Sequence, residues 1–165
     1  MPTDPSRPTA SPIVIERTWA ATPQELWALW TTKEGFASWW GPQGFRADVY
    51  TLHAVPGGLL HYDMVADSPE MVSAMQAAGQ PASHPVRARW GELRPYTRLT
   101  LVNTIDFLPG VPAYESIIQV DLLDLGGRTT MRVTLSPMHV PEMSRMQAEG
   151  FESQLTKLEA RFSAR

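Results

Sequence analysis

The segment Pro141–Phe162 carries the pattern that most constrains this chain. Its large apolar residues follow one another at steps of three, five, four, three and four residues: Met143, Met146, Phe151, Leu155, Leu158 and Phe162. This spacing is close to the 3.6-residue period of an α-helix, so it predicts a long helix with a single apolar stripe. Pro141 suits the first helical position, and Glu142 lies beside the positive end of the helix dipole. Such a stripe must be buried, so the rest of the chain has to build a surface beneath it.

The residues before this helix alternate in the way that is typical of antiparallel sheets. In 129–135, for example, Met131, Val133 and Leu135 alternate with polar side chains. Short connections containing Gly and Pro separate the segments, which favours antiparallel neighbours. Seven strands are predicted: 13–19, 45–52, 59–65, 86–93, 99–107, 114–122 and 129–135. One face of each is apolar and the other polar, so we expect an α+β fold in which the C-terminal helix covers one face of the sheet.

Length and composition limit the classes of protein. The 165 residues are expected to form a Pro-rich disordered arm at 1–12 and a single domain at 13–163. The net charge of −3 argues against a nucleic-acid or anionic membrane partner. No apolar run of membrane-spanning length and no signal-peptide core occurs, so we expect a cytoplasmic protein. The chain has no cysteine, and its four histidines are not spaced as metal ligands, so no metal and no cofactor are expected.

Three shorter helical segments interrupt the strand pattern. Thr22-Pro23-Gln24-Glu25 is a capping box with proline at the first helical position, and a second helical turn follows at 33–38. An insertion at about 68–80 begins with Ser68 as N-cap and carries Met71 and Met75 on one face. A surface helix packed on the sheet edge is one interpretation of this insertion. The other is a lid over the mouth of a pocket, formed by Met71 and Met75.

A few polar residues stand out as candidates for chemistry. His61 and Asp63 lie two apart on one strand and share a face, as an acid–base pair or half of a metal site would. Glu115 would be a general base only if its face were the inner one, and the alternation places it outside. Asn103 is a polar residue in register with the apolar side chains of its strand. It must be satisfied by another side chain, by water or by a ligand.

Four motifs together resemble a known superfamily. They are Pro23-x-Glu25-x-Trp27; Trp39-Trp40-Gly41-Pro42 followed by Gly44-Phe45; Pro56-Gly57-Gly58; and Gly150-Phe151-Glu152 with Leu155 and Leu158. With the order of elements, these motifs resemble the SRPBCC superfamily of the birch-pollen allergen, steroidogenic lipid-transfer domains and polyketide cyclases. Within it, they are similar to the branch of homologues of the activator of heat-shock-protein ATPase. Phe151 is a departure, because that branch usually has tryptophan there.

The resemblance implies a helix-grip fold, in which a curved seven-stranded antiparallel sheet wraps around the C-terminal helix and leaves a pocket between them. Members bind hydrophobic small molecules, and some catalyse cyclisation, aromatisation or hydrolysis. The insertion and the loop at 106–112 depart from the plainest pattern of the family, so no ligand can be transferred from relatives.

We therefore favour the binding of a hydrophobic or aromatic small molecule in that cavity, without catalysis. The predicted lining is Trp40, Tyr62, Trp90, Asn103, Tyr114, Met138, Met146 and Phe151, with Met71 and Met75 as lid. The alternatives are a cyclase- or hydrolase-like enzyme that uses His61, Asp63 or Glu115, and a protein-interaction module without a ligand. A homodimer formed through a sheet edge or the insertion helix is compatible with the sequence.

Overall fold

The computed structural model describes residues 11–106 and 108–163, so residues 1–10 of the predicted Pro-rich arm lie outside the described residues. The described residues form seven strands and four helices in the order β1(Ile13–Trp19), α1(Pro23–Thr31), α2(Lys33–Ala37), β2(Phe45–Leu52), β3(Leu59–Ala66), α3(Pro69–Ala77), β4(Ser83–Arg94), β5(Arg98–Ile105), β6(Tyr114–Asp124), β7(Thr129–Leu135) and α4(Pro141–Phe162).

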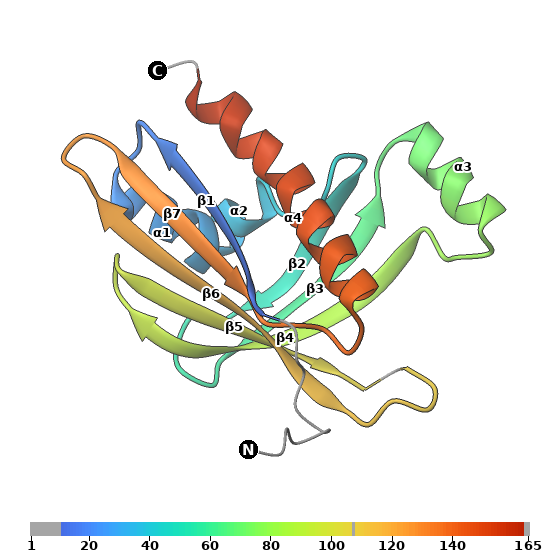
Figure 1. The fold of residues 1–165 in the computed structure, drawn as a ribbon. Helices are drawn as coiled ribbons and strands as arrows, with labels where there is room; N and C mark the ends of the chain where they lie inside the picture. The colour runs from blue at the N-terminus through green and yellow to red at the C-terminus, as the bar shows by residue number, and fades with distance from the viewer. Residues whose placement is uncertain (1–10, 107, 164–165) are drawn as a thin grey trace, which may run out of the picture.

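The strands form one antiparallel sheet in the order β1-β7-β6-β5-β4-β3-β2. The sheet is curved, and α4 crosses its concave side, while α1 and α2 lie at one end (Figure 1). The predicted α+β helix-grip fold is therefore confirmed. Hydrophobic alternation predicts a sheet with one covered face, because residues two apart on a strand share a face, and the family resemblance implied the helix-grip arrangement.

The sheet divides between β4 and β5. β4 pairs with β3 as far back as Ser83, but with β5 only from the Ala88–Asn103 pair onward. Beyond that pair, β3 and β4 run toward α3, whereas β5 and β6 run toward the hairpin that joins them (Figure 1). Pro85, which has no backbone N–H to donate, lies in the stretch of β4 without a β5 partner. The division thus creates an opening within the sheet.

The C-terminal half of α4 closes the hydrophobic core. Phe151, Leu155, Leu158 and Phe162 are all buried against the concave face. Phe151 stacks on Trp30, with ring centroids 6.2 Å apart, and Phe162 packs on Trp19 at 5.6 Å. Each side chain of this size contributes about 1.5–3 kcal/mol by leaving water. This half of the helix is therefore fixed by packing.

Polar contacts fix the same half of α4 to the segment that enters β2. The N–H of Gly41 donates to Gln154 Oε1 at 3.0 Å, and the N–H of Gln43 donates to Ser153 Oγ at 3.0 Å. Lys157 Nζ donates to the carbonyl oxygen of Phe45 at 2.9 Å. These bonds satisfy backbone groups of a connection that is not part of the sheet ladder.

The N-terminal half of α4 is held more lightly. Ser144 is its buried residue, and its Oγ accepts a hydrogen bond of 2.8 Å from the N–H of Met138. Met146, predicted to line the pocket, is instead 53% exposed. The helix rotates the position of Met146 away from the sheet and places Gln147 toward it. This half of α4 therefore directs two polar side chains, Ser144 and Gln147, toward the sheet, while Ala148 packs against the core.

Gly150 lies between the two halves of α4, and we predict that replacing it with alanine stabilises the protein. No other described atom lies within 4 Å of the position that a Cβ would take there, so close packing does not explain this glycine. Gly150→Ala should raise the free energy of unfolding by about 0.5–1 kcal/mol through helix propensity. Urea unfolding measures the change.

The matched control is Gly35→Ala in α2. A Cβ at Gly35 would overlap the carbonyl oxygen of Ala28, which belongs to the backbone and cannot move aside cheaply. This variant should lose at least about 1 kcal/mol. A Gly150→Ala variant that is destabilised like Gly35→Ala would contradict the open space found at Gly150.

Candidate functional site: a cavity where the sheet divides

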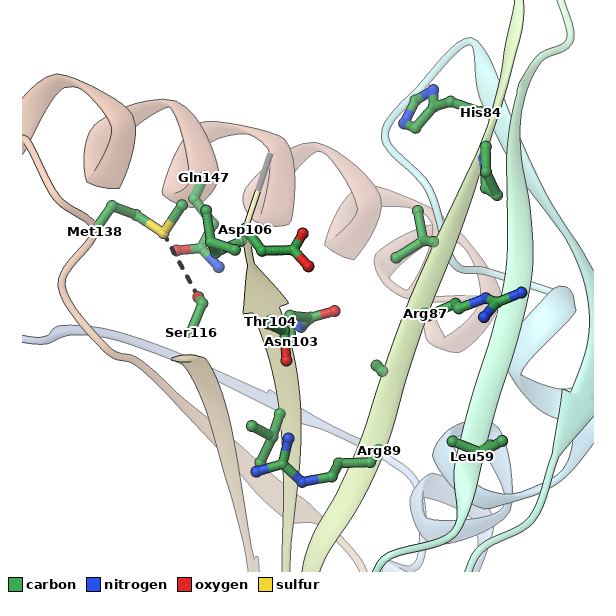
Figure 2. A pocket seen from close by; sticks show the side chains of 15 residues that line it. Leu59, His84, Arg87, Arg89, Asn103, Thr104, Asp106, Ser116, Met138 and Gln147 are labelled. Carbon is green, nitrogen blue, oxygen red and sulfur yellow. Dashed lines mark hydrogen bonds between the residues drawn. The ribbon is translucent and has the colours of Figure 1, made fainter. Parts of the chain in front are cut away.

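A cavity of about 700 Å³ occupies the opening between β4 and β5, next to the N-terminal half of α4 (Figure 2). Its volume lies within the range of about 300–1,000 Å³ that is typical of small-molecule sites. The residues that line it are Leu59, His84, Pro85, Val86, Arg87, Ala88, Arg89, Val102, Asn103, Thr104, Ile105, Asp106, Ser116, Met138 and Gln147. Residues of both sheet faces contribute, because the two strands no longer pair there.

One part of this cavity, which we call the inner end, lies on the concave side of the sheet beside α4. It is formed by Val86, Ala88, Asn103, Ser116, Met138 and Gln147. The register places Ala88, Asn103 and Ser116 side by side on neighbouring strands. Gln147 reaches from α4 toward Ser116 (Figure 2). The inner end is therefore lined by apolar groups and by uncharged polar groups.

The connection between β7 and α4 forms one wall of the inner end and is tied to β6. Ser116 Oγ donates to Met138 Sδ at 3.5 Å, as drawn in Figure 2. Tyr114 Oη lies 2.9 Å from His139 Nδ1 and accepts a hydrogen bond from the N–H of His139 at 3.3 Å. These contacts position Met138 over the sheet.

The charged side chains of the lining are exposed to solvent or lie on the convex side. His84, Arg87 and Asp106 are exposed, and Asp106 lies near Gln147 in the view of Figure 2. Arg89 lies on the convex side, where its Nη2 contacts Glu115 Oε1 at 2.5 Å. None of the charged residues that line the cavity is therefore buried.

The predicted lining residues fall into two groups. Asn103 and Met138 line the cavity. Tyr114 is not among the described lining residues, but it contacts Met138. Trp40, Tyr62, Trp90 and Phe151 are buried in the hydrophobic core and are absent from the described residues that line the cavity. The rings of Trp40, Tyr62 and Phe151 pack on other aromatic rings, as in the stack of Phe36 on Trp40 at 4.6 Å. Because these aromatic side chains are large and apolar, they are buried in the core and do not face the cavity.

The predicted lid residues lie elsewhere too. α3, capped by Ser68, packs Met71 against Gly44, whose Cβ position would be 3.1 Å from Met71 Cε. Neither Met71 nor Met75 is among the described lining residues. α3 projects from the β3 end of the sheet, apart from α4 (Figure 1). In this conformation it does not cover the cavity.

His61, Asp63 and Glu115 all lie on the convex face. His61 and Asp63 alternate with the buried Leu60 and Tyr62, and the Tyr50 hydroxyl donates to Asp63 Oδ2. Glu115 alternates with Ser116 and pairs with Arg89. An enzyme that uses these residues would need at least one of them to face the pocket. None of the three is among the described residues that line the cavity.

Ser116 and Gln147 line the cavity, and the sequence prediction did not include them. Ser116 shares the apolar face of its strand with Ile118 and Val120, and Gln147 lies four residues from both Met143 and Phe151 on the stripe of α4. A polar residue on an apolar stripe is the same signal that identified Asn103. Applied to every predicted element, that signal would have found both.

Comparisons with known proteins place the chain in a family. Residues 20–163 match the model of the family described as Activator of Hsp90 ATPase homolog 1-like protein. The chain belongs to this family. No match was found among curated proteins.

Solved structures of similar fold come from several bacteria. The AHSA1 protein from Silicibacter pomeroyi is 20% identical with a TM-score of 0.72, covering 93% of this chain and 99% of its own. A protein from Chromobacterium violaceum is 20% identical with a TM-score of 0.70, covering 93% and 98%. The Aha1 dimer from Colwellia psychrerythraea is 14% identical with a TM-score of 0.64, covering 93% and 96%. At these identities the likeness establishes the fold alone.

Within the described part of the chain, none of the helices is both long and apolar enough to span a bilayer. Nor do three or more His, Cys, Asp or Glu side chains of that part come together as ligands for a metal ion.

The buried Trp40–Tyr62 pair predicts a stability change at alkaline pH. Trp40 Nε1 donates to the Tyr62 hydroxyl at 2.9 Å, and burial raises the pKa of Tyr62 to about 12 although this hydrogen bond opposes the rise. Above about pH 10 the unfolded chain ionises Tyr62 while the folded chain keeps it neutral, so the free energy of unfolding falls by about 1.4 kcal/mol per pH unit.

Comparison with Tyr62→Phe isolates this contribution. The variant leaves Trp40 Nε1 without its partner and starts about 1–3 kcal/mol less stable. Urea unfolding should show that the advantage of the wild type shrinks as the pH rises above about 10. A difference that does not change with pH would mean that Tyr62 is accessible to water.

Proposed function

We propose that the protein binds a hydrophobic or aromatic small molecule in the cavity between β4, β5 and α4. The observation that supports this proposal is the cavity itself, which combines a volume of about 700 Å³ with a largely apolar wall. Sites of this composition gain affinity from apolar burial at about 25 cal/mol per Å² and use a few polar groups to orient the ligand. Membership in the family is compatible with such a role.

The lining residues offer two kinds of contact to a ligand, apolar and polar. Val86, Ala88, Ile105 and Met138 offer apolar surface, and the unbranched thioether of Met138 adapts to differently shaped ligands. Asn103 is the predicted polar residue that lines the same space. It orients a bound molecule without the cost of burying a charge.

The other two functions have less support. An enzyme using His61, Asp63 or Glu115 would need one of them beside the bound substrate, and all three lie on the convex face. An interaction module without a ligand would be favoured by a pocket filled with its own side chains, whereas this cavity is open.

We also propose that the protein forms a homodimer. Its support is the dimer formed by the Aha1 protein of Colwellia psychrerythraea and the presence of two edge strands, β1 and β2, in this sheet. Sedimentation equilibrium would decide it, since a mass equal to one chain at every concentration would contradict a dimer.

A ring placed in the floor of the cavity should abolish binding. Ala88 is buried between Leu60 and Asn103 on the concave face, so the side chain of Ala88→Phe would occupy the inner end. The neutral fluorophore N-phenyl-1-naphthylamine should bind the wild type saturably, with increased emission. We expect Ala88→Phe to weaken this binding at least about tenfold, equivalent to 1.4 kcal/mol.

The matched control is Ala160→Phe, which adds the same ring at an exposed position on the C-terminal half of α4. It should bind the fluorophore as the wild type does. Circular dichroism confirms that both variants are folded. Unchanged binding by a folded Ala88→Phe variant, or no saturable binding by the wild type, would contradict the proposed site.

A further inference from the structure

Two carboxamide side chains face the cavity from opposite walls, and neither has a side-chain hydrogen bond to another described residue. Asn103 extends from β5 and Gln147 from α4, and both line the cavity (Figure 2). Gln147 Oε1 is shielded from solvent and has no partner among the described residues. The side chain of Asn103 likewise makes no hydrogen bond to the described residues.

Ser116 adds an acceptor to the same place. It lies directly opposite Asn103 in the β5–β6 register, and its hydroxyl proton is directed to Met138 Sδ. The lone pairs of its oxygen are therefore left for another donor. Together with Gln147 Oε1, the inner end offers two acceptor oxygens and, at Asn103, a group that both donates and accepts.

An unsatisfied polar atom at such a site is costly in free energy. Leaving a buried acceptor without a donor costs about 1–3 kcal/mol, and almost all buried polar groups in folded proteins have a partner. Other polar residues of α4 follow this rule, since Ser144, Ser153 and Gln154 each accept a hydrogen bond. Gln147 is thus an exception on its own helix, and it is the residue that faces the cavity.

The chemistry of the inner end favours an uncharged partner. Its buried polar atoms belong to amides and a hydroxyl, whereas the charged residues His84, Arg87 and Asp106 are exposed to solvent and keep their hydration. A carboxylate or ammonium group placed at the inner end would lose its hydration without gaining an opposite charge. A neutral group with N–H or O–H donors would meet the acceptors without that loss.

From these contacts we propose that Asn103, Ser116 and Gln147 form a recognition site for an uncharged hydrogen-bonding group of the ligand, such as a carboxamide, attached to an apolar body. This proposal rests on the proposed function, because it assigns the ligand class of the same cavity. Apolar burial provides affinity, and the three side chains select the neutral polar group.

Four probes that share one ring system test the assignment by displacement of N-phenyl-1-naphthylamine: 2-naphthamide, 2-naphthoate, 2-naphthylmethylammonium and 2-methylnaphthalene. The wild type should prefer the amide to both charged probes. Gln147→Leu keeps the approximate volume and removes the acceptor, so it should weaken 2-naphthamide about two- to tenfold and leave 2-methylnaphthalene unchanged. Gln24→Leu, an exposed position on α1, is the matched control and should change neither affinity.

The outcomes separate the two proposals. If the fluorophore does not bind the wild type, the proposed function fails and this inference fails with it. If the fluorophore binds but the amide has no advantage over the charged probes, or Gln147→Leu weakens all probes equally, the proposed function stands and the amide recognition site is wrong. Either of these outcomes would mean that Gln147 bonds to water and not to the ligand. Asn103→Leu provides an independent repeat from the other wall.

Discussion

The structure depends on the way in which the C-terminal half of α4 is fixed to the concave face of the sheet. Phe151, Leu155 and Leu158 bury an apolar stripe, and Gln154 and Lys157 bond the segment that enters β2. Packing and polar contacts thus act on the same turns of the helix. Because a helix is stiff, fixing one half also sets the direction of the other half. That direction carries Gln147 to the opening between β4 and β5.

The division of the sheet is the second constraint, and it depends on strand pairing. Full pairing of β4 with β5 would fill the space that the cavity occupies. Instead β4 continues with β3 alone, through a stretch that contains Pro85, and β5 continues with β6 alone. Unpaired strand edges are a liability in most sheets. Here they face a cavity next to a helix.

The fold was predictable from the sequence because it depends on local periodicity. Alternation along the strands and the 3.6-residue stripe of α4 each specify a face, which predicts a sheet covered by a helix, and the resemblance of the motifs to a known family implied the curved helix-grip arrangement. The site was predictable only where polarity breaks an apolar face, as at Asn103. The aromatic residues Trp40 and Trp90 were assigned to the pocket by size, yet size equally favours the core, and their depth depends on contacts between distant elements. The separation of β4 from β5 is likewise set by pairing partners far apart in the chain.

The proposed ligand would lie in the inner end of the cavity, between the divided sheet and α4. Intermolecular nuclear Overhauser effects between bound N-phenyl-1-naphthylamine and protein methyl groups test it most directly. If the ligand lies there, we expect contacts from its ring protons to the methyl groups of Val86, Ala88 and Met138, which come from two separate walls. Contacts to methyl groups outside this lining, with none to these three, would contradict it.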